Sequence, residues 1–288
     1  MSRYKFMRWP EGRLKAVTFS YDDGCHQDIR FSELLCRYGL KCTFNINSSF
    51  VPAQDGTSKL SYAEIKEHIL DKGHEVAVHG ENHRANTLQR TVDGIRDVLD
   101  CRRSLESNLG IIVRGMAYPD SGICIETAAT SDYGKVKQYL EDLGIVYSRT
   151  LGGDNDSFDL PRDWHAWMPT AHHPNAQIFE YVDKFVSMTE ESQYFAKRVP
   201  KLFYLWGHSF EFDREDGWEH IEEIAKRISG KDDTWYATNM EIYNYVKAYE
   251  ALEISVDEKI YYNPTLIKVW IWIDGKIHAV APGETLRL

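Results

Sequence analysis

The chain has 288 residues and a mass of 33.4 kDa, a size that suits one large α/β domain with a substantial core. With 43% hydrophobic and 27% charged residues, it is a folded globular protein rather than a disordered, collagen-like or membrane-embedded one. The net charge of −10 argues against nucleic acid as a partner, because phosphate binders carry a basic face.

The start of the chain and its cysteines indicate where the protein works. The segment Met1–Lys15 holds no apolar stretch of the kind that directs secretion, and no apolar run approaches the ~20 residues of a membrane-spanning helix. The five cysteines are scattered and form no CxxC pair, a pattern typical of reduced thiols. We therefore expect a cytoplasmic protein with no membrane partner. Association into a homo-oligomer is left open.

Strands and helices alternate along the first half of the chain. The expected strands are Lys15–Ser20, Cys42–Ile46, His74–Val78, Ile111–Met116 and Ile145–Ser148. The expected helices are Gln27–Tyr38, one that begins after Ser61 with Glu64 completing a capping box, Leu88–Asn108 and Tyr133–Leu143. Because strand and helix alternate at short spacing, we expect parallel pairing in a fold of repeated βα units.

The pattern dissolves in a loop from Leu151 to Pro174 that is rich in Asp, Pro, Trp and His. Loops of this length without periodicity are usually functional. Regular elements return as helix Ala176–Met188, strand Lys201–Trp206, helix Trp218–Ile228, strand Thr234–Ala237 and helix Glu241–Leu252.

The C-terminal tail has a different character. Leu266–Ile273 alternates between apolar and polar residues, Asp274-Gly275 is a two-residue turn, and Lys276–Ala281 completes a hairpin. We therefore divide the chain into a main domain, residues 1–254, and a small antiparallel β appendage, residues 255–288, packed on it.

Three groups of polar residues follow predicted strands, where α/β folds build their active sites. Asp22 and Asp23 are adjacent carboxylates, which either form a simple helix-capping turn or share a site with a cation. His79 and His83 are spaced to share one face and, with Asp23, form a ligand set for a divalent ion. His208 follows a late strand and suits a general acid.

These motifs, in this order, resemble the polysaccharide deacetylase family, the homology domain of the nodulation-type chitooligosaccharide deacetylases. Thr18–Gly24 is similar to the family's TFDDG motif, although extra residues precede the Asp pair. Gly73–His83 is similar to its GHE…HxxxH segment, and Leu205–His208 to its late strand that ends in a catalytic histidine. The resemblance extends over residues 15–250.

The resemblance implies an irregular (β/α) barrel with about seven parallel strands, and metal-dependent hydrolysis of an N-acetyl or O-acetyl group on a sugar or oligosaccharide. Asp23, His79 and His83 would bind one divalent ion. Zinc suits this set best, and cobalt, nickel, manganese and iron also fit it. Asp22 would be the base that activates a metal-bound water, and His208 the acid that protonates the leaving group.

Two further motifs of the family are matched in part. In the segment Arg114–Pro119, the resemblance implies that Arg114 keeps Asp22 ionised and that the backbone N–H of Tyr118 binds the oxyanion. Trp164 would form a wall of the substrate pocket. The carboxylate that supports His208 would come from the same long loop, which holds Asp159 and Asp163 among other polar residues.

Two other functions remain open at this point. The same metal centre could hydrolyse another non-peptide C–N bond, such as that of a cyclic amide. The eight Trp and seventeen Tyr residues would also suit a carbohydrate-binding protein without catalysis. The complete set of two acids and three histidines favours an enzyme.

Overall fold

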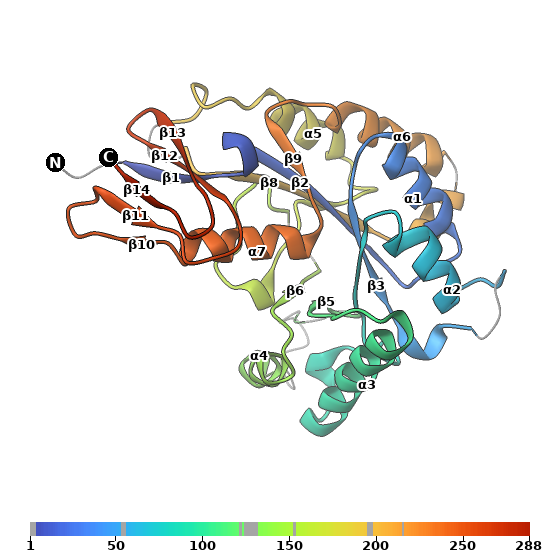
Figure 1. Cartoon of the computed structure of the whole chain (residues 1–288). Coiled ribbons are helices and arrows are strands. Elements are labelled where there is room, and N and C mark those ends of the chain that lie inside the picture. Colours follow the sequence, from blue (N-terminus) through green and yellow to red (C-terminus); the bar gives the residue numbers. More distant parts are fainter. Residues whose placement is uncertain are drawn as a thin grey trace.

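The computed structural model describes residues 4–52, 56–120, 123, 132–151, 154–194, 198–214 and 216–288. Its centre is a curled parallel sheet with the strand order β6-β5-β4-β3-β2-β8-β7, and β9 pairs with the first residues of β2 (Figure 1). The strands are β2 Lys15–Asp22, β3 Cys42–Ile46, β4 Glu75–Val78, β5 Gly115–Ala117, β6 Tyr147–Arg149, β7 Ala171–His172, β8 Lys201–Gly207 and β9 Thr234–Tyr236. The expected irregular (β/α) barrel of about seven parallel strands is confirmed.

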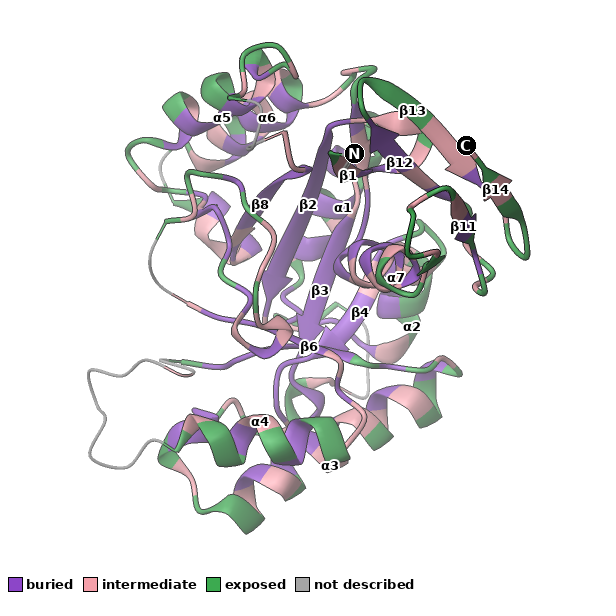
Figure 2. Cartoon of the chain, turned by 90° about the vertical axis from the view of Figure 1, so that its left-hand side faces the viewer, coloured by how far each residue is buried: buried purple, intermediate pink, exposed green. Residues whose placement is uncertain are grey.

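Helices cover the outside of this sheet and turn their buried faces toward it (Figure 2). They are α1 Gln27–Arg37, α2 Tyr62–Ile65, α3 Thr91–Leu109, α4 Tyr133–Asp142, α5 Ile178–Ser187, α6 Gly217–Ile228 and α7 Asn239–Glu250. Short helical turns are η1 Pro10–Gly12, η2 Ser48–Phe50, η3 Lys66–Leu70, η4 Asn86–Leu88, η6 Trp164–Ala166 and η8 Ser209–Asp213. The predicted capping box of Ser61 and Glu64 starts α2.

The central strands are buried on both sides, which explains their continuous apolar sequences. Every residue of β2 and β3 is buried, and the side chains of β2 pack between the barrel interior and α1. All strands of this sheet are parallel, so their carboxyl ends lie at one edge. The polar residues that follow the strands are therefore gathered at that edge.

The long loop has more structure than its sequence indicates. Trp167 forms a parallel bridge with Arg149 of β6, and β7 pairs with β8 a few residues later. The segment between Trp167 and His172 therefore connects the two edges of the curled sheet. A two-residue strand is too short to produce a periodic pattern, which is why it could not be predicted.

The appendage consists of two small antiparallel sheets that lie beside α7 (Figure 1). The predicted hairpin is present as β12 Val269–Ile273 and β13 Lys276–Val280, and it pairs with β1 Lys5–Arg8 from the start of the chain. The second sheet contains β10 Glu253–Ile254, β11 Ile260–Tyr262 and β14 Thr285–Arg287.

A buried tyrosine fastens the appendage to the barrel. The hydroxyl of Tyr245, on α7, donates to the carbonyl of Arg8 at 2.6 Å and accepts from the N–H of Trp270 at 3.0 Å. The appendage thus uses strands from both ends of the chain, and the division at residue 254 stays a prediction. Among the described residues, no helix combines the length and the apolar character needed to cross a membrane.

Candidate active site

The carboxyl ends of β2 and β4 bring three candidate metal ligands together. Oδ1 of Asp23 lies 3.7 Å from Nε2 of His79 and 3.5 Å from Nε2 of His83. The ligand atoms of all three side chains lie within 4.8 Å of one another. Ligands bound at about 2.1 Å to a tetrahedral ion are about 3.4 Å apart. The spacing of this group therefore fits a divalent ion.

The hydrogen bonding of the group fits an ion as well. Oδ1 of Asp23 is closed off from solvent and has no hydrogen-bond partner. Nδ1 of His79 lies 2.9 Å from the carbonyl of Ala117, which leaves Nε2 free to face Asp23. A carbonyl on the far nitrogen is a common way to orient a ligating imidazole. The buried acceptor and the oriented imidazole together favour a bound cation.

Strained backbone lies under two of these residues. Asp23 has φ 82° and His83 has φ 51°, in the left-handed region that side chains other than glycine rarely adopt. Such conformations destabilise the fold by roughly 1–3 kcal/mol each and cluster at functional sites. The N–H of Asp23 donates to the carbonyl of Asn45 at 2.9 Å, which holds the turn in place.

Asp22 is buried beside the candidate ligands and is held by polar partners. Its Oδ2 is paired with Arg149, whose guanidinium is fully buried, and its Oδ1 accepts a hydrogen bond of 2.8 Å from Asn45. Burial alone would raise the pKa of Asp22. The charges of Arg149, His79 and His208 outweigh that effect and lower it, so Asp22 is ionised at neutral pH.

The cation on Asp22 is therefore Arg149, and the assignment of this role to Arg114 was wrong. Arg114 precedes β5 and is exposed at the amino end of that strand, whereas Asp22 ends β2 at the opposite edge. Arg149 ends β6 and reaches Asp22 across the barrel, with its guanidinium 4.6 Å from the ring of Trp206.

Two other predicted contacts are absent from the site. The N–H of Tyr118 donates to the carbonyl of Arg149 at 3.0 Å, so the sheet already uses the donor that was expected to bind an oxyanion. The ring of Trp164 packs 4.9 Å from Trp167 and 5.0 Å from Tyr243 of α7. Trp164 thus belongs to the packing between η6 and α7, whereas the ring of Trp206 lies beside Arg149.

His208 lies at the end of β8 with Glu211 as its carboxylate partner. Nδ1 of His208 is 3.4 Å from Oε2 of Glu211, which also accepts the backbone N–H of His208 at 3.3 Å. Burial would lower the pKa of His208. The hydrogen bond to Glu211 and the charges of Asp22, Glu211 and Asp23 outweigh it and raise the pKa. His208 therefore keeps its proton to a higher pH than a free imidazole.

The two carboxylates expected from the long loop have other partners. Asp163 binds the Tyr133 hydroxyl at 2.8 Å and the Lys137 ammonium at 2.9 Å. Asp159 binds the Lys201 ammonium at 2.7 Å. Neither of these acids is therefore free to support His208.

The loop instead contributes two histidines next to Glu211. Nε2 of His172 lies 2.8 Å from Oε2 of Glu211, and its ring stacks on Trp206 at 4.3 Å. His173 is buried, which lowers its pKa to about 3 and keeps it neutral. A Cβ on Gly207 would lie 2.0 Å from Nδ1 of His173. A glycine at that position is therefore what allows the loop to approach β8.

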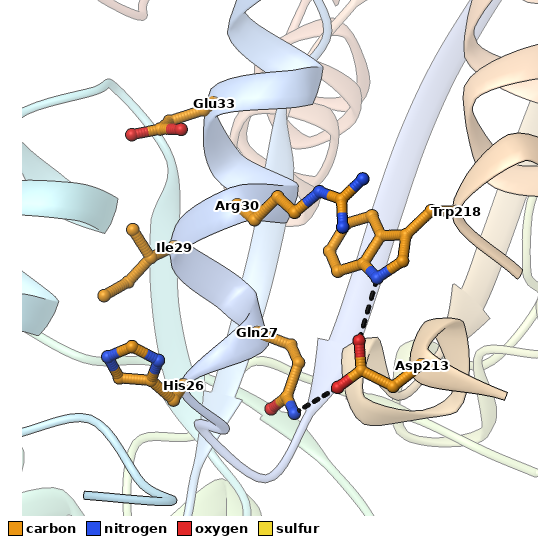
Figure 3. A pocket seen from close by; sticks show the side chains of 7 residues that line it. All are labelled: His26, Gln27, Ile29, Arg30, Glu33, Asp213 and Trp218. Atoms are coloured by element: carbon orange, nitrogen blue, oxygen red, sulfur yellow. Dashed lines mark hydrogen bonds between the residues drawn. The ribbon is translucent and has the colours of Figure 1, made fainter. Parts of the chain in front are cut away.

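A pocket of about 310 Å³ flanks the site between α1 and the start of α6 (Figure 3). Asp213 accepts hydrogen bonds from Gln27 at 2.7 Å and from the indole of Trp218 at 2.9 Å, and the Arg30 guanidinium lies over that indole. None of the candidate metal ligands lines this pocket. Its hydrogen bonds join the segment that follows Asp23 to the segment that follows His208.

Sequence reasoning missed Arg149, Glu211 and His172. Arg149 directly follows the predicted strand Ile145–Ser148, and that position is a signal that could have been used. Glu211 lies three residues after His208, a spacing that also favours a contact. His172 gives no local signal, because only pairing between β7 and β8 brings it to the site.

Comparison with known proteins agrees with the motifs and the fold. The family model described as "Polysaccharide deacetylase" matches residues 5–142, which include Asp22 and the candidate metal ligands Asp23, His79 and His83. No curated protein matches the sequence.

Two solved structures share the fold at low identity. One is a Mycobacterium smegmatis protein described as a "putative polysaccharide deacetylase". It has 17% identity and a TM-score of 0.57, and the match covers 87% of this chain and 96% of that one. A point mutant of peptidoglycan deacetylase PdaC from Bacillus subtilis has 17% identity and a TM-score of 0.50 over 83% of this chain and 94% of its own. Residues 5–142 thus match the polysaccharide deacetylase family, and most of the chain shares the fold of these two structures.

Proposed function

We propose that the protein is a metal-dependent hydrolase that removes N-acetyl or O-acetyl groups from a sugar or oligosaccharide. The observation that carries this proposal is the group of Asp23, His79 and His83, whose ligand atoms lie within 4.8 Å of one another beside the buried carboxylate of Asp22. A divalent ion held there, zinc in this proposal, would polarise the acetyl carbonyl and lower the pKa of a water toward 7.

Asp22 is the proposed base. The Arg149 guanidinium and the Asn45 amide fix the orientation of its carboxylate and keep it ionised, so it accepts a proton from water without a conformational change. Its Oδ2 lies 3.8 Å from Nε2 of His79, a proximity to one of the candidate ligands that supports this role.

His208 is the proposed acid, which donates a proton to the departing nitrogen or oxygen of the sugar. The charges of Asp22 and Asp23 help to raise the pKa of His208, which supports a protonated His208 near an ionised Asp22. With Asp22 ionised and His208 protonated, the rate should follow a bell-shaped pH profile. The low-pH limb would reflect protonation of Asp22, and the high-pH limb deprotonation of His208.

A panel of substrates tests this function. The purified protein, loaded with zinc, is given an N-acetylglucosamine oligosaccharide, an O-acetylated xylo-oligosaccharide and a cyclic amide. We expect acetate release from at least one of the sugars, a loss of about 10²–10⁴-fold in Asp22→Asn, and an unchanged rate in the exposed control Arg114→Met. Ring opening of the cyclic amide without acetate release would support the alternative C–N hydrolase. Sugar binding without any turnover would support a non-catalytic protein.

A further inference from the structure

A second cluster of metal-ligand side chains lies next to the first. His172, His208 and Glu211 supply two imidazoles and one carboxylate, the same set as Asp23, His79 and His83. Their ligand atoms also lie within 4.8 Å of one another. Oε2 of Glu211 is 2.8 Å from Nε2 of His172 and 3.4 Å from Nδ1 of His208. The 3.4 Å separation is close to those of the first group, whereas the 2.8 Å separation is that of a hydrogen bond, which an ion would replace.

The three side chains are held in place by separate elements. His172 belongs to β7 and stacks on the Trp206 ring with an interplanar angle of 19°. His208 follows β8, and Glu211 lies in η8, where it accepts the N–H of His208. A metal ion would therefore meet ligands that need little rearrangement, which is the condition for tight binding.

One nitrogen of the cluster has only a long contact. Nδ1 of His208 is closed off from solvent and lies 3.4 Å from Oε2 of Glu211, an oxygen that already binds Nε2 of His172 at 2.8 Å. A cation between His208, His172 and Glu211 would give this nitrogen a stronger partner.

Ions can reach this cluster from solvent. A hollow of about 580 Å³ opens beside it and is lined by His173, Pro174, Glu211, Arg214, Asp216, Gly217 and His220. The side chains of His172, His208 and Glu211 are 29%, 22% and 18% exposed. The cluster is thus accessible without unfolding.

We propose that His172, His208 and Glu211 form a second site for a divalent transition ion such as Zn²⁺ or Co²⁺, and that an ion bound there inhibits the enzyme. An ion on Nδ1 of His208 takes the place of one proton, which is released to solvent. The imidazole then cannot become doubly protonated, so it cannot act as the acid. The inhibition rests on the proposed role of His208, whereas the site itself does not.

Metal counting tests the site without any substrate. The metal-free protein is dialysed against Co²⁺, and the ions bound per chain are measured by elemental analysis, with circular dichroism as the check of folding. We expect two ions for the wild type and one for each of Asp23→Asn, His172→Gln and Glu211→Gln. The matched control is His220→Gln, which should still bind two ions. His220 lines the same hollow, but its Nε2 is bound to the His173 carbonyl at 2.9 Å.

Two results would overturn the second site. One is a single ion in the wild type at Co²⁺ concentrations that saturate the Asp23 group. The other is two bound ions in both His172→Gln and Glu211→Gln. Two variants are used because each removes a different ligand, so a folding defect in one of them would not affect the other.

Zn²⁺ inhibition of acetate release tests the consequence. Excess Zn²⁺ should slow the wild type, and His172→Gln should need at least about tenfold more Zn²⁺ for the same fractional loss of its own rate. Two bound ions without inhibition would overturn the inhibitory effect and the role of His208 as acid, while the site would stand.

Discussion

The ion pair of Arg149 and Asp22 gives the sharpest test of the site's electrostatics. The Arg149 side chain is 0% exposed and that of Asp22 is 2% exposed, so Arg149→Met leaves a buried carboxylate without its cation. Removing one partner of a buried pair destabilises a fold by about 3–5 kcal/mol. Arg114→Met, at the exposed position that sequence reasoning favoured, should change the free energy of unfolding by no more than about 0.5 kcal/mol.

The pH dependence of this difference has a definite sign. In the wild type the pKa of Asp22 is lowered, so its contribution to stability is present above the unfolded pKa near 4 and is lost as the pH falls through the folded value. Without Arg149, burial dominates and raises the pKa of Asp22, which makes the variant less stable as the pH rises. The stability gap between the two proteins should therefore widen from pH 4 to pH 7.

Urea unfolding followed by circular dichroism, in the presence of a chelator, measures this gap. Arg149→Lys keeps a positive charge and should recover part of the loss, which covers the case in which Arg149→Met does not fold. A gap that is small at pH 7, equal to that of Arg114→Met, or independent of pH would refute the account of Asp22.

Three further predictions concern single residues around the site. Glu211→Gln removes an anion that raises the pKa of His208, so the high-pH limb of the rate profile should move to lower pH; an unmoved limb would show that Glu211 does not act on the acid. Gly207→Ala places a Cβ against His173 and should lower the free energy of unfolding by about 1–3 kcal/mol in urea titrations, and a neutral effect would contradict the packing. Burial raises the pKa of the Asp28 carboxyl to about 7, so its contribution to stability is complete below pH 4 and is lost as the pH rises. Asp28→Asn should therefore gain stability relative to the wild type between pH 4 and pH 8, and a constant difference in urea titrations would contradict this.

Local signals in the sequence were enough to predict the strands that hold the candidate metal ligands. Asp22 and Asp23 follow an apolar strand, and His79 follows another, so their gathering at one edge is a consequence of parallel pairing. The second strand was predicted with its observed bounds, Cys42–Ile46. Binary pattern and turn chemistry determine these features over short stretches of chain.

Contacts between distant parts of the chain could not be read in the same way. Arg149 and Asp22 are 127 positions apart in the sequence. Arg114 and Arg149 each lie at an end of a three-residue strand, so the local sequence does not show which of them reaches Asp22. The predicted strand Ile111–Met116 begins in fact at Gly115, which leaves Arg114 at the amino end of the sheet. Strand β1 was missed because its partner, β12, lies more than 260 residues later.

The most direct test of the central claim is acetate release from an N-acetylglucosamine oligosaccharide before chelation, after chelation and after Zn²⁺ is returned. The wild type should lose its rate on chelation and regain it with one equivalent of Zn²⁺. Asp23→Asn should stay at least about tenfold slower at the same Zn²⁺ concentration. Wild-type turnover that survives complete metal removal, or an Asp23→Asn rate equal to that of the wild type, would contradict a reaction that depends on an ion held by Asp23, His79 and His83.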